Sequence, residues 1–334
     1  MIPLRPLTLG DLLGGAFSAM SRYWKPLFGT AVIAYGAALV AVLGALLIAY
    51  LAVEDSLRAW FDHLEYGDLP WEDGRTLLTA LGAVVLFSIL LMMFSTAVVY
   101  AATSAVVQDA VLGRPATFGA IWRRAWSRMP SVLGTVLLTS LIAGAPMLAF
   151  GVVMLGLLAA SAGEGQDAAG TLFGIWALLM LASLPVTVWL WVRFCLAPAA
   201  AVFEEHGPVA ALRRSARLVQ GSWWRTFGIG LLTIILAAAL GYIIQLPFSI
   251  VGAFTMLPGM MTAGADPSPS AIYGSMGAYL GLSMLGGAIS QIVQTILPQL
   301  VASLLYVDQR IRRESLDLRL AEAAGMPMAG PPQR

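Results

Sequence analysis

The chain has 334 residues, of which 59% are hydrophobic and 11% are charged, and its formal net charge is +1. A soluble domain averages about 45–50% apolar and about 25% charged residues. This composition excludes an ordinary soluble protein and indicates that lipid surrounds much of the chain.

Six long stretches without charged residues follow one another along the chain. Each exceeds the roughly 20 apolar residues that a helix needs to cross about 30 Å of hydrocarbon. One such stretch can be a buried core helix, but six in succession indicate an all-α polytopic membrane protein. We predict six transmembrane helices at about 28–52, 77–105, 132–160, 171–197, 227–256 and 274–305.

The basic residues predict the orientation of these helices. Of the nineteen Lys and Arg residues, seventeen lie on one side of the predicted spans, and only Arg58 and Arg75 lie on the other, in the acidic loop 54–75. Basic residues concentrate in cytoplasmic segments, so both termini are predicted to be cytoplasmic. The apolar core starts near Leu27, after an amphipathic stretch, and no cleavable signal peptide is expected. The absence of asparagine and the single Lys25 favour a high-GC bacterial genome, and therefore a bacterial cell membrane.

An amphipathic pattern recurs before every second span. Residues 8–20 and 117–129 place apolar residues at i, i+3, i+4 and i+7, and a looser copy covers 208–220. Thr8 with Asp11 predicts a capping box at the first copy. Each copy is followed by an aromatic or basic knuckle, two spans and an acidic residue, so the repeats start on the same side and are parallel. We predict one membrane domain, 1–334, with repeats at about 5–109, 114–205 and 207–314 and a cytoplasmic C-terminal tail at 306–334.

Two interpretations of the amphipathic segments remain open. They form structural elbows, either flat in the interface or packed beneath the spans, which is the favoured interpretation. Alternatively, they present a docking surface for a cytosolic partner or an anionic lipid. The docking surface would consist of Arg123, Arg124, Arg128, Arg213, Arg214, Arg217, Arg310, Arg312 and Arg313.

Acidic residues stand where each predicted hairpin ends, level with those arginines. They are Asp109, Glu204 or Glu205, and Asp308. We expect them to form structural ion pairs between the repeats. Their spacing does not resemble a set of metal ligands.

Motifs for catalysis are absent from the sequence. HExxH, CxxC, GxSxG and GxxxxGK[ST] do not occur, and neither His63 nor His206 has a partner at metal-ligand spacing. Cys195, the single cysteine, excludes an internal disulfide and is expected to pack as a small apolar residue. We expect no enzyme activity, no cofactor and no metal. The basic residues are spread along membrane edges, so no nucleic-acid partner is expected either.

Glutamines are the conspicuous polar residues within the spans: Gln245, Gln291, Gln294 and Gln299. Interhelical hydrogen bonds, worth about 0.6 kcal/mol each on average, are the favoured explanation, and a polar cavity is the alternative. No ionisable group lies at a span centre, which argues against an ion-coupled pump. Among the six predicted spans, only spans three to six contain proline. The second and third repeats are therefore the candidates for any cavity.

The two ends of the chain carry a resemblance to a known family. The opening Arg5-Pro-Leu-Thr-Leu-Gly-Asp-Leu-Leu-Gly-Gly-Ala-Phe and the closing Leu305-Tyr-Val-Asp-Gln-Arg-Ile-Arg-Arg-Glu-Ser-Leu-Asp-Leu resemble the termini of largely uncharacterised actinobacterial membrane proteins. These proteins are similar to the membrane domain of glycerophosphoryl diester phosphodiesterase. The resemblance implies six spans in the cell membrane and no established activity. In fused members a separate soluble barrel carries the phosphodiester chemistry, so no catalytic residue is carried over to this chain.

These observations predict a non-enzymatic integral membrane protein, a scaffold or accessory subunit of a membrane complex. Its expected partners are the lipid bilayer and a cytosolic or membrane protein. The alternative is a permease-like component for an apolar or amphiphilic solute, with a membrane enzyme as the third and least favoured reading. The sequence predicts no particular oligomeric state.

Overall fold

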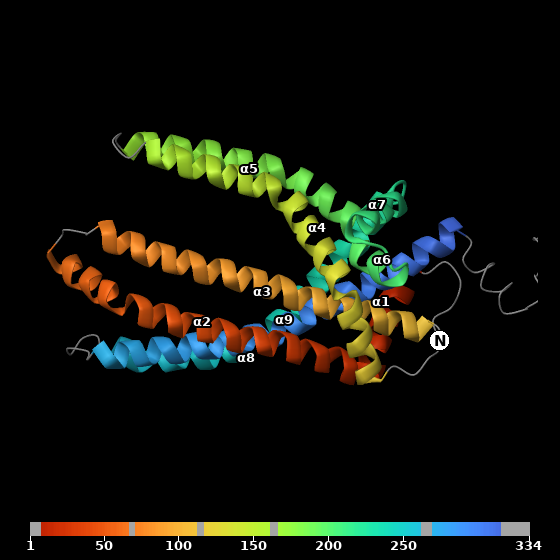
Figure 1. Cartoon of the computed structure of the whole chain (residues 1–334), viewed down its shortest axis with the longest axis horizontal. Coiled ribbons are helices and arrows are strands. Elements are labelled where there is room, and N and C mark those ends of the chain that lie inside the picture. The colour runs from red at the N-terminus through yellow and green to blue at the C-terminus, as the bar shows by residue number, and fades with distance from the viewer. Residues whose placement is uncertain (1–7, 67–70, 112–116, 161–165, 262–268, 315–334) are drawn as a thin grey trace, which may run out of the picture. The chain divides into compact units, whose positions relative to one another are not determined.

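The computed structural model describes residues 8–66, 71–111, 117–160, 166–261 and 269–314, and these residues form helices without any strand (Figure 1). Arg5, Arg114 and the tail 315–334, which the sequence analysis singled out, lie outside the described residues, and nothing is described of the side chains of residues 57–73. The helices are α1 (Leu9–Arg22), α2 (Trp24–Tyr66), α3 (Trp71–Val111), α4 (Phe118–Ala160), α5 (Gln166–Phe194), α6 (Ala197–Phe203), α7 (Pro208–Val219), α8 (Trp223–Met261) and α9 (Pro269–Glu314).

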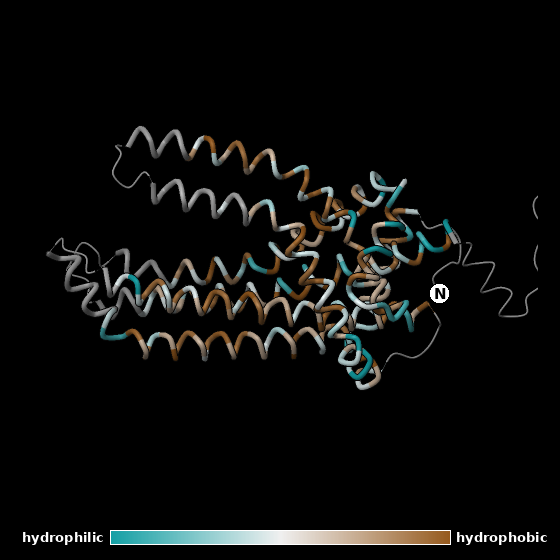
Figure 2. The backbone as a smooth tube through the Cα atoms, turned by 45° about the horizontal axis from the view of Figure 1, so that its top comes forward, coloured by the Kyte–Doolittle hydropathy of each residue, from teal (hydrophilic) through white to brown (hydrophobic). Residues whose placement is uncertain are grey.

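Six of the described helices are long and apolar enough to cross a membrane, which confirms the predicted number and order of spans. Large apolar side chains along them remain exposed, among them Ile48 on α2 at 71% and Leu178 on α5 at 69%. Figure 2 shows hydrophobic stretches along these helices. Exposed apolar surface on this scale suits lipid rather than water. The membrane-crossing segments are Trp24–Ser56, Gly74–Val111, Phe118–Met147, Phe173–Phe203, Trp223–Thr255 and Gly274–Arg313.

The chain divides into two compact units. The first compact unit contains α1, α4 to α7 and parts of α3, α8 and α9, within 1–23, 100–235 and 297–334. The second compact unit contains 24–99 and 236–296, and therefore α2 with the remaining parts of α3, α8 and α9. The division follows contacts and not the predicted repeats, because three of the long helices contribute to both compact units.

The core of the first compact unit surrounds the C-terminal half of α9. Leu297, Leu300 and Leu304 are buried there, and all of α6 except Phe203 is buried as well. Ala101 to Val107 on α3 are also buried. Small side chains on α3 and α6 allow these helix backbones to pack closely.

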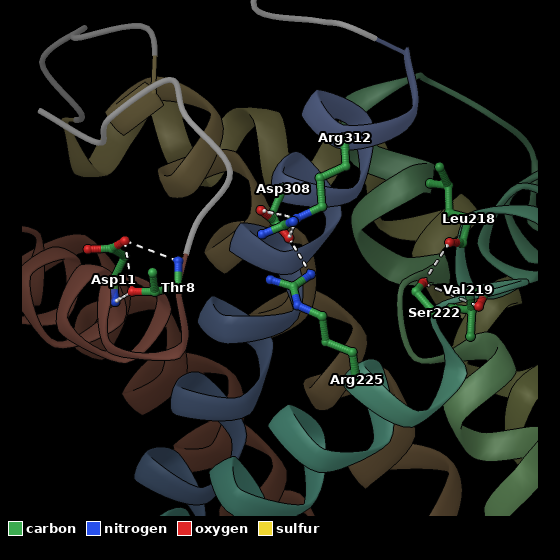
Figure 3. Close-up of polar contacts among 8 residues, drawn as sticks. All are labelled: Thr8, Asp11, Leu218, Val219, Ser222, Arg225, Asp308 and Arg312. Atoms are coloured by element: carbon green, nitrogen blue, oxygen red, sulfur yellow. Dashed lines mark hydrogen bonds and ion pairs between the residues drawn. The ribbon is translucent and has the colours of Figure 1, made fainter.

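Helix α1 begins with the predicted capping box. The Asp11 amide donates to Thr8 Oγ1 at 3.2 Å, and the Thr8 amide donates to Asp11 Oδ2 at 3.0 Å (Figure 3). These bonds satisfy two backbone donors that the first turn would leave unpaired. The apolar face buries Leu12, Ala16 and Ala19, as the i, i+4, i+7 pattern predicts.

The second amphipathic segment differs from the prediction. Residues 118–129 are the first turns of α4 and continue into the span, so the separate helix and knuckle predicted there are wrong. Pro130 lies inside α4, where proline bends a helix without necessarily ending it. By contrast, α7 is a separate helix because Gly221 follows it with φ +83°, a left-handed conformation that stops the helix. Tyr23, with φ −110° and ψ 30°, separates α1 from α2.

Glycines mark the closest contacts between helices. In the first compact unit, a Cβ added to Gly134 of α4 would lie 2.4 Å from Pro208 Cγ, at the start of α7. In the second, Gly241 of α8 lies against Gln294 of α9, and Gly286 of α9 lies against Phe248 of α8. Glycine permits this approach because it has no side chain, as is common between membrane helices.

Candidate functional site

Glu204 is the centre of a cluster of polar side chains in the first compact unit. Arg214 of α7 forms a bidentate contact with it, with Nε 2.9 Å from Oε2 and Nη2 2.7 Å from Oε1. Tyr306 of α9 donates its hydroxyl to Oε1 at 2.5 Å, and Arg310 Nε lies 3.6 Å from the same oxygen. The Glu204 side chain is only 14% exposed. A charged, half-enclosed acceptor with this many donors holds α7 and α9 against the end of α6.

The local sequence places Glu204 where the chain reverses direction. Helix α6 starts with Pro198 in its first turn and ends at Phe203, so Glu204 is its C-cap. Glu205 follows with φ +57°, and Gly207 and Pro208 then begin α7. Proline suits a first helical turn because it has no amide to leave unpaired. Four residues therefore connect α6 to α7 and bring Arg214 back to Glu204.

Two further acidic residues are paired in the same compact unit. Asp109, at the end of α3, accepts from Arg124 Nη1 at 2.7 Å. Asp308 has no exposed side-chain surface and accepts from Arg225 Nη1 at 2.6 Å and from Arg312 Nε at 3.0 Å (Figure 3). All three acidic residues at the predicted hairpin ends form ion pairs. Asp109 and Glu204 pair with an arginine of the next predicted repeat, whereas Asp308 pairs within its own.

The environment of Glu204 fixes its charge. Burial alone would raise the pKa of this carboxyl group, but the hydrogen bonds from Arg214 and Tyr306 and the positive charges of Arg214 and Arg310 lower the pKa below its ordinary value of 4.5. Glu204 therefore remains ionised at neutral pH, and its contacts are those of a carboxylate.

Acid is expected to weaken the fold through Glu204. Because the pKa is lower in the folded state, the contribution is fully present above pH 4.5 and is lost as the pH falls through the folded-state pKa. Glu204→Gln should lower the melting temperature at pH 7. It should also reduce the decrease of the melting temperature as the pH falls below 4.5. Thermal unfolding in detergent between pH 3 and 7 measures both effects. The control is Glu205→Gln, which changes the exposed neighbour of Glu204. Parallel pH curves for wild type and Glu204→Gln would contradict the assignment.

Most arginines of the predicted docking surface are occupied by contacts within the protein. Arg128 pairs with Glu205, and Arg313 donates to the backbone oxygens of Arg217 and Gln220. The arginines bound to acidic side chains are Arg124, Arg128, Arg214, Arg310 and Arg312. In the part of the chain that the structure describes, Arg123, Arg213 and Arg217 are exposed and their guanidinium groups have no acidic partner. The predicted set is therefore divided between internal bracing and an exposed trio.

A polar cavity of about 450 Å³ lies beside the Asp109–Arg124 pair. Arg123 and Arg128 of α4 contribute to its wall, together with Glu205. The two carboxylates reduce the positive charge of the three arginines here, so the cavity is not a strong anion site. Arg123, one of the three exposed arginines, therefore lines the same cavity as the Asp109–Arg124 and Glu205–Arg128 pairs.

The four predicted glutamines form different contacts. Gln245 Nε2 donates to the Ser283 backbone oxygen at 3.1 Å, from α8 to α9, and Gln299 Nε2 donates to Ser104 Oγ at 3.1 Å, from α9 to α3. These are the interhelical hydrogen bonds that the favoured interpretation predicts. Gln294 bonds within α9, to Ser290 Oγ at 3.4 Å.

Gln291 lines a cavity, and that cavity is apolar. It has a volume of about 520 Å³ in the second compact unit, between α2, α3 and α9, with Met92 and Met284 among its walls. Its polar part is a cluster around Tyr35, whose hydroxyl donates to Thr295 Oγ1 at 3.0 Å and lies 3.2 Å from Thr96 Oγ1. Gln291 therefore borders an apolar cavity, whereas Gln245 and Gln299 form interhelical hydrogen bonds.

Sequence reasoning missed the two tyrosines that organise these sites. Tyr35 and Tyr306 each lie within an uncharged stretch, where a tyrosine reads as an apolar residue. Their hydroxyl groups form hydrogen bonds with Thr295 and Glu204, which residues distant in the sequence supply only in the folded protein. An aromatic residue with a polar end inside a span is the one signal that was present. Among the described residues, no three His, Cys, Asp or Glu side chains lie close enough to hold a metal ion.

Comparison with known proteins gives a family but no relative of known activity. No curated protein matches the chain, and no solved structure matches it. A family model described as "Domain of unknown function (DUF7847)" matches residues 27–308. The matched segment runs from near the start of α2 to Asp308 of α9 and includes the Asp109–Arg124 and Glu204–Arg214 pairs. Because the match covers more than half of the 334 residues, the chain belongs to the DUF7847 family.

Proposed function

We propose that this protein is a non-enzymatic scaffold or accessory subunit of a complex in a bacterial cell membrane. Both termini lie in the cytoplasm, and the chain is built from three parallel repeats. The observation that carries the proposal is the bracing of α4, α7 and α9 by Asp109, Glu204 and Asp308. A braced surface loses little conformational freedom when a partner binds, which is what a scaffold requires.

The partner would bind the exposed arginines. Arg213 and Arg217 stand four residues apart on α7 and therefore share a face of that helix. Arg123 adds a third exposed guanidinium from α4. Three cations that internal carboxylates leave unpaired favour an acidic protein surface as the partner.

The ion pairs also support the three repeats. Arg124 and Arg214 are both the seventh residue after the residue that caps their helix segment, Thr117 and Gly207, and each pairs with the acid that ends the preceding hairpin. The corresponding residue of the first repeat is Gly15, which contacts Leu304 instead. Asp308 is accordingly paired by Arg225 and Arg312.

Charge reversal on α7 tests the scaffold. Arg213→Glu/Arg217→Glu should remove the partner that co-purifies with the tagged protein from membranes of its own host, with loss of at least tenfold in quantitative mass spectrometry. Arg22→Glu, a single reversal on α1 of an arginine outside the predicted docking set, is the control and should retain the partner. The same set of co-purified proteins from wild type and the double variant would contradict the proposal.

Cysteine labelling tests the orientation. In a Cys195→Ala background, cysteines introduced separately at Ser56 and Ser127 should react with a membrane-impermeant thiol reagent from opposite sides. Ser127 should be labelled only in inside-out vesicles. Labelling of both positions from the same side would contradict the topology.

The apolar cavity of the second compact unit favours a second candidate function, a permease-like component. The cavity has apolar walls and the Tyr35 and Gln291 side chains at its polar part, which suits an amphiphile with one polar end. In proteoliposomes, transport of a fluorescent fatty acid that falls in Gln291→Leu would support this function over the scaffold. Transport equal to that of empty liposomes would contradict it.

A further inference from the structure

A second polar cavity in the first compact unit has a composition unlike the one beside Asp109. It has a volume of about 250 Å³ and lies where α5 approaches the turn between α7 and α8. Trp189 and Arg193 line it from α5, Gln220 and Gly221 from the turn, and Trp223 from the first residue of α8. No acidic side chain is among its lining residues.

Arg193 is the cation of this cavity. Its guanidinium lies 4.9 Å from the centre of the Trp189 ring, and it has no carboxylate partner in the described part of the chain. Ser215 Oγ donates to the Arg193 backbone oxygen at 2.9 Å and so fixes α7 against this end of α5. Carboxylates pair with the arginines around Glu204 and Asp308, whereas the positive charge of Arg193 is available to pair with a ligand.

Trp223 places an unpaired donor next to the cavity that it lines. Its indole Nε1 is buried and has no acceptor among the described residues. The ring stacks on Phe227 at 5.2 Å between centroids, which holds the indole in place. A buried donor without an acceptor is costly, so a ligand oxygen that accepted this bond would be bound more tightly.

The turn that closes the cavity is held by a second arginine. Arg313 of α9 donates Nη1 to the Arg217 backbone oxygen at 3.1 Å and also donates to the Gln220 backbone oxygen. Its Nη2 lies 3.2 Å from the position that a Cβ on Gly221 would take. A second positive charge therefore stands beside the cavity and raises its attraction for an anion.

The position of the cavity indicates where the anion comes from. Arg193 lies in the last turn of one membrane-crossing helix, and Trp223 begins the next. Trp189 and Trp224 are exposed by 45% and 77%, as tryptophans are at the boundary between lipid and water. Arginine and tryptophan at this depth meet the phosphate layer of the bilayer.

We propose that this cavity binds the phosphate of an anionic glycerophospholipid. Arg193 forms the ion pair with the phosphate, and the Trp223 indole donates a hydrogen bond to it. The volume admits a headgroup and not the acyl chains, which remain in the bilayer. The lipid then fixes the joint between α5, α7 and α8 to the membrane surface. This inference does not depend on the scaffold function.

Native mass spectrometry of the full chain in detergent tests the proposal with phosphatidylglycerol as the probe. Wild type should retain the lipid, Arg193→Gln should weaken binding at least tenfold, and Trp223→Phe should weaken it several-fold. Arg193→Lys keeps the charge and should retain part of the affinity. Arg22→Gln removes an exposed arginine of α1 that does not line the cavity and should leave binding unchanged.

Three outcomes would overturn the proposal. Equal loss in Arg22→Gln would mean unspecific attraction to basic residues. Equal binding of phosphatidylcholine would exclude selectivity for an anionic lipid. Displacement of the lipid by millimolar inorganic phosphate would assign the cavity to the free anion. If Arg193→Gln fails to fold, retained binding in Trp223→Phe together with undiminished binding in Arg193→Lys would also contradict the assignment.

Discussion

Asp308→Ala is expected to lower the free energy of unfolding by about 3 kcal/mol, the lower end of the range for breaking a buried ion pair from one side. The Asp308 side chain is fully buried and holds two guanidinium groups, those of Arg225 and Arg312. The side chains of these arginines are 31% and 38% exposed, so water partly solvates their guanidinium groups when the carboxylate is removed. Loss of this contact separates α8 from α9 at that point, since Arg225 and Asp308 lie on those helices.

The measurement is thermal unfolding in detergent, followed by a thiol-reactive dye on Cys195, the single cysteine of the chain. Asp55→Ala, an exposed acidic residue of α2, is the control and should stay within about 0.5 kcal/mol of wild type. Arg312→Met should cost less than Asp308→Ala because Arg225 still pairs with the carboxylate. Equal stability of Asp308→Ala and Asp55→Ala would contradict the prediction.

Gly134→Ala is expected to destabilise the protein by about 2 kcal/mol, within the range for overpacking a close contact. The new Cβ would lie 2.4 Å from Pro208 Cγ and 3.0 Å from Pro208 Cβ, and the rigid proline ring has no rotamer that avoids it. Helix α7 must therefore move away from α4. The movement would also strain the Arg214–Glu204 contact, because Arg214 lies on α7.

The same substitution elsewhere in α4 is the matched control. A Cβ on Gly144 would have no neighbour within 4 Å, so Gly144→Ala should be neutral or slightly stabilising through its helix propensity. Pro208→Ala should restore part of the stability that Gly134→Ala loses, which a double-mutant cycle measures. A similar melting temperature for Gly134→Ala and Gly144→Ala would exclude the proposed clash.

The spans and the ion pairs were predictable from the sequence because their physical causes are local. An uncharged stretch long enough to cross hydrocarbon is visible in the sequence itself, and so is the capping box of Thr8 and Asp11. Acidic residues level with arginines also indicated pairing. The sequence left the choice between Glu204 and Glu205 open. The left-handed Glu205 decides it, since it is 67% exposed while Glu204 faces Arg214 and Tyr306.

Other features depend on neighbours that the sequence does not reveal. The continuity of α4 through Pro130 was not predicted, because a proline after an amphipathic segment usually reads as a boundary. The cavity at Arg193 requires α5 to approach the end of α7 and the start of α8, and spacing along the chain does not indicate this. The close approach of Gly134 to Pro208 likewise joins residues that are far apart in the sequence.

The ion pairs also imply an order of assembly during synthesis. Arg124 and Arg214 lie fifteen and ten residues after their acidic partners, so these pairs can form as soon as each segment leaves the ribosome. Tyr306 follows Glu204 by 102 residues, and Asp308 follows Arg225 by 83. Until α9 is inserted, Arg225 has no Asp308 to neutralise it. Helix α9 therefore completes the pairing, and a nascent chain stalled before residue 306 would lack the contacts of Tyr306 with Glu204 and of Asp308 with Arg225.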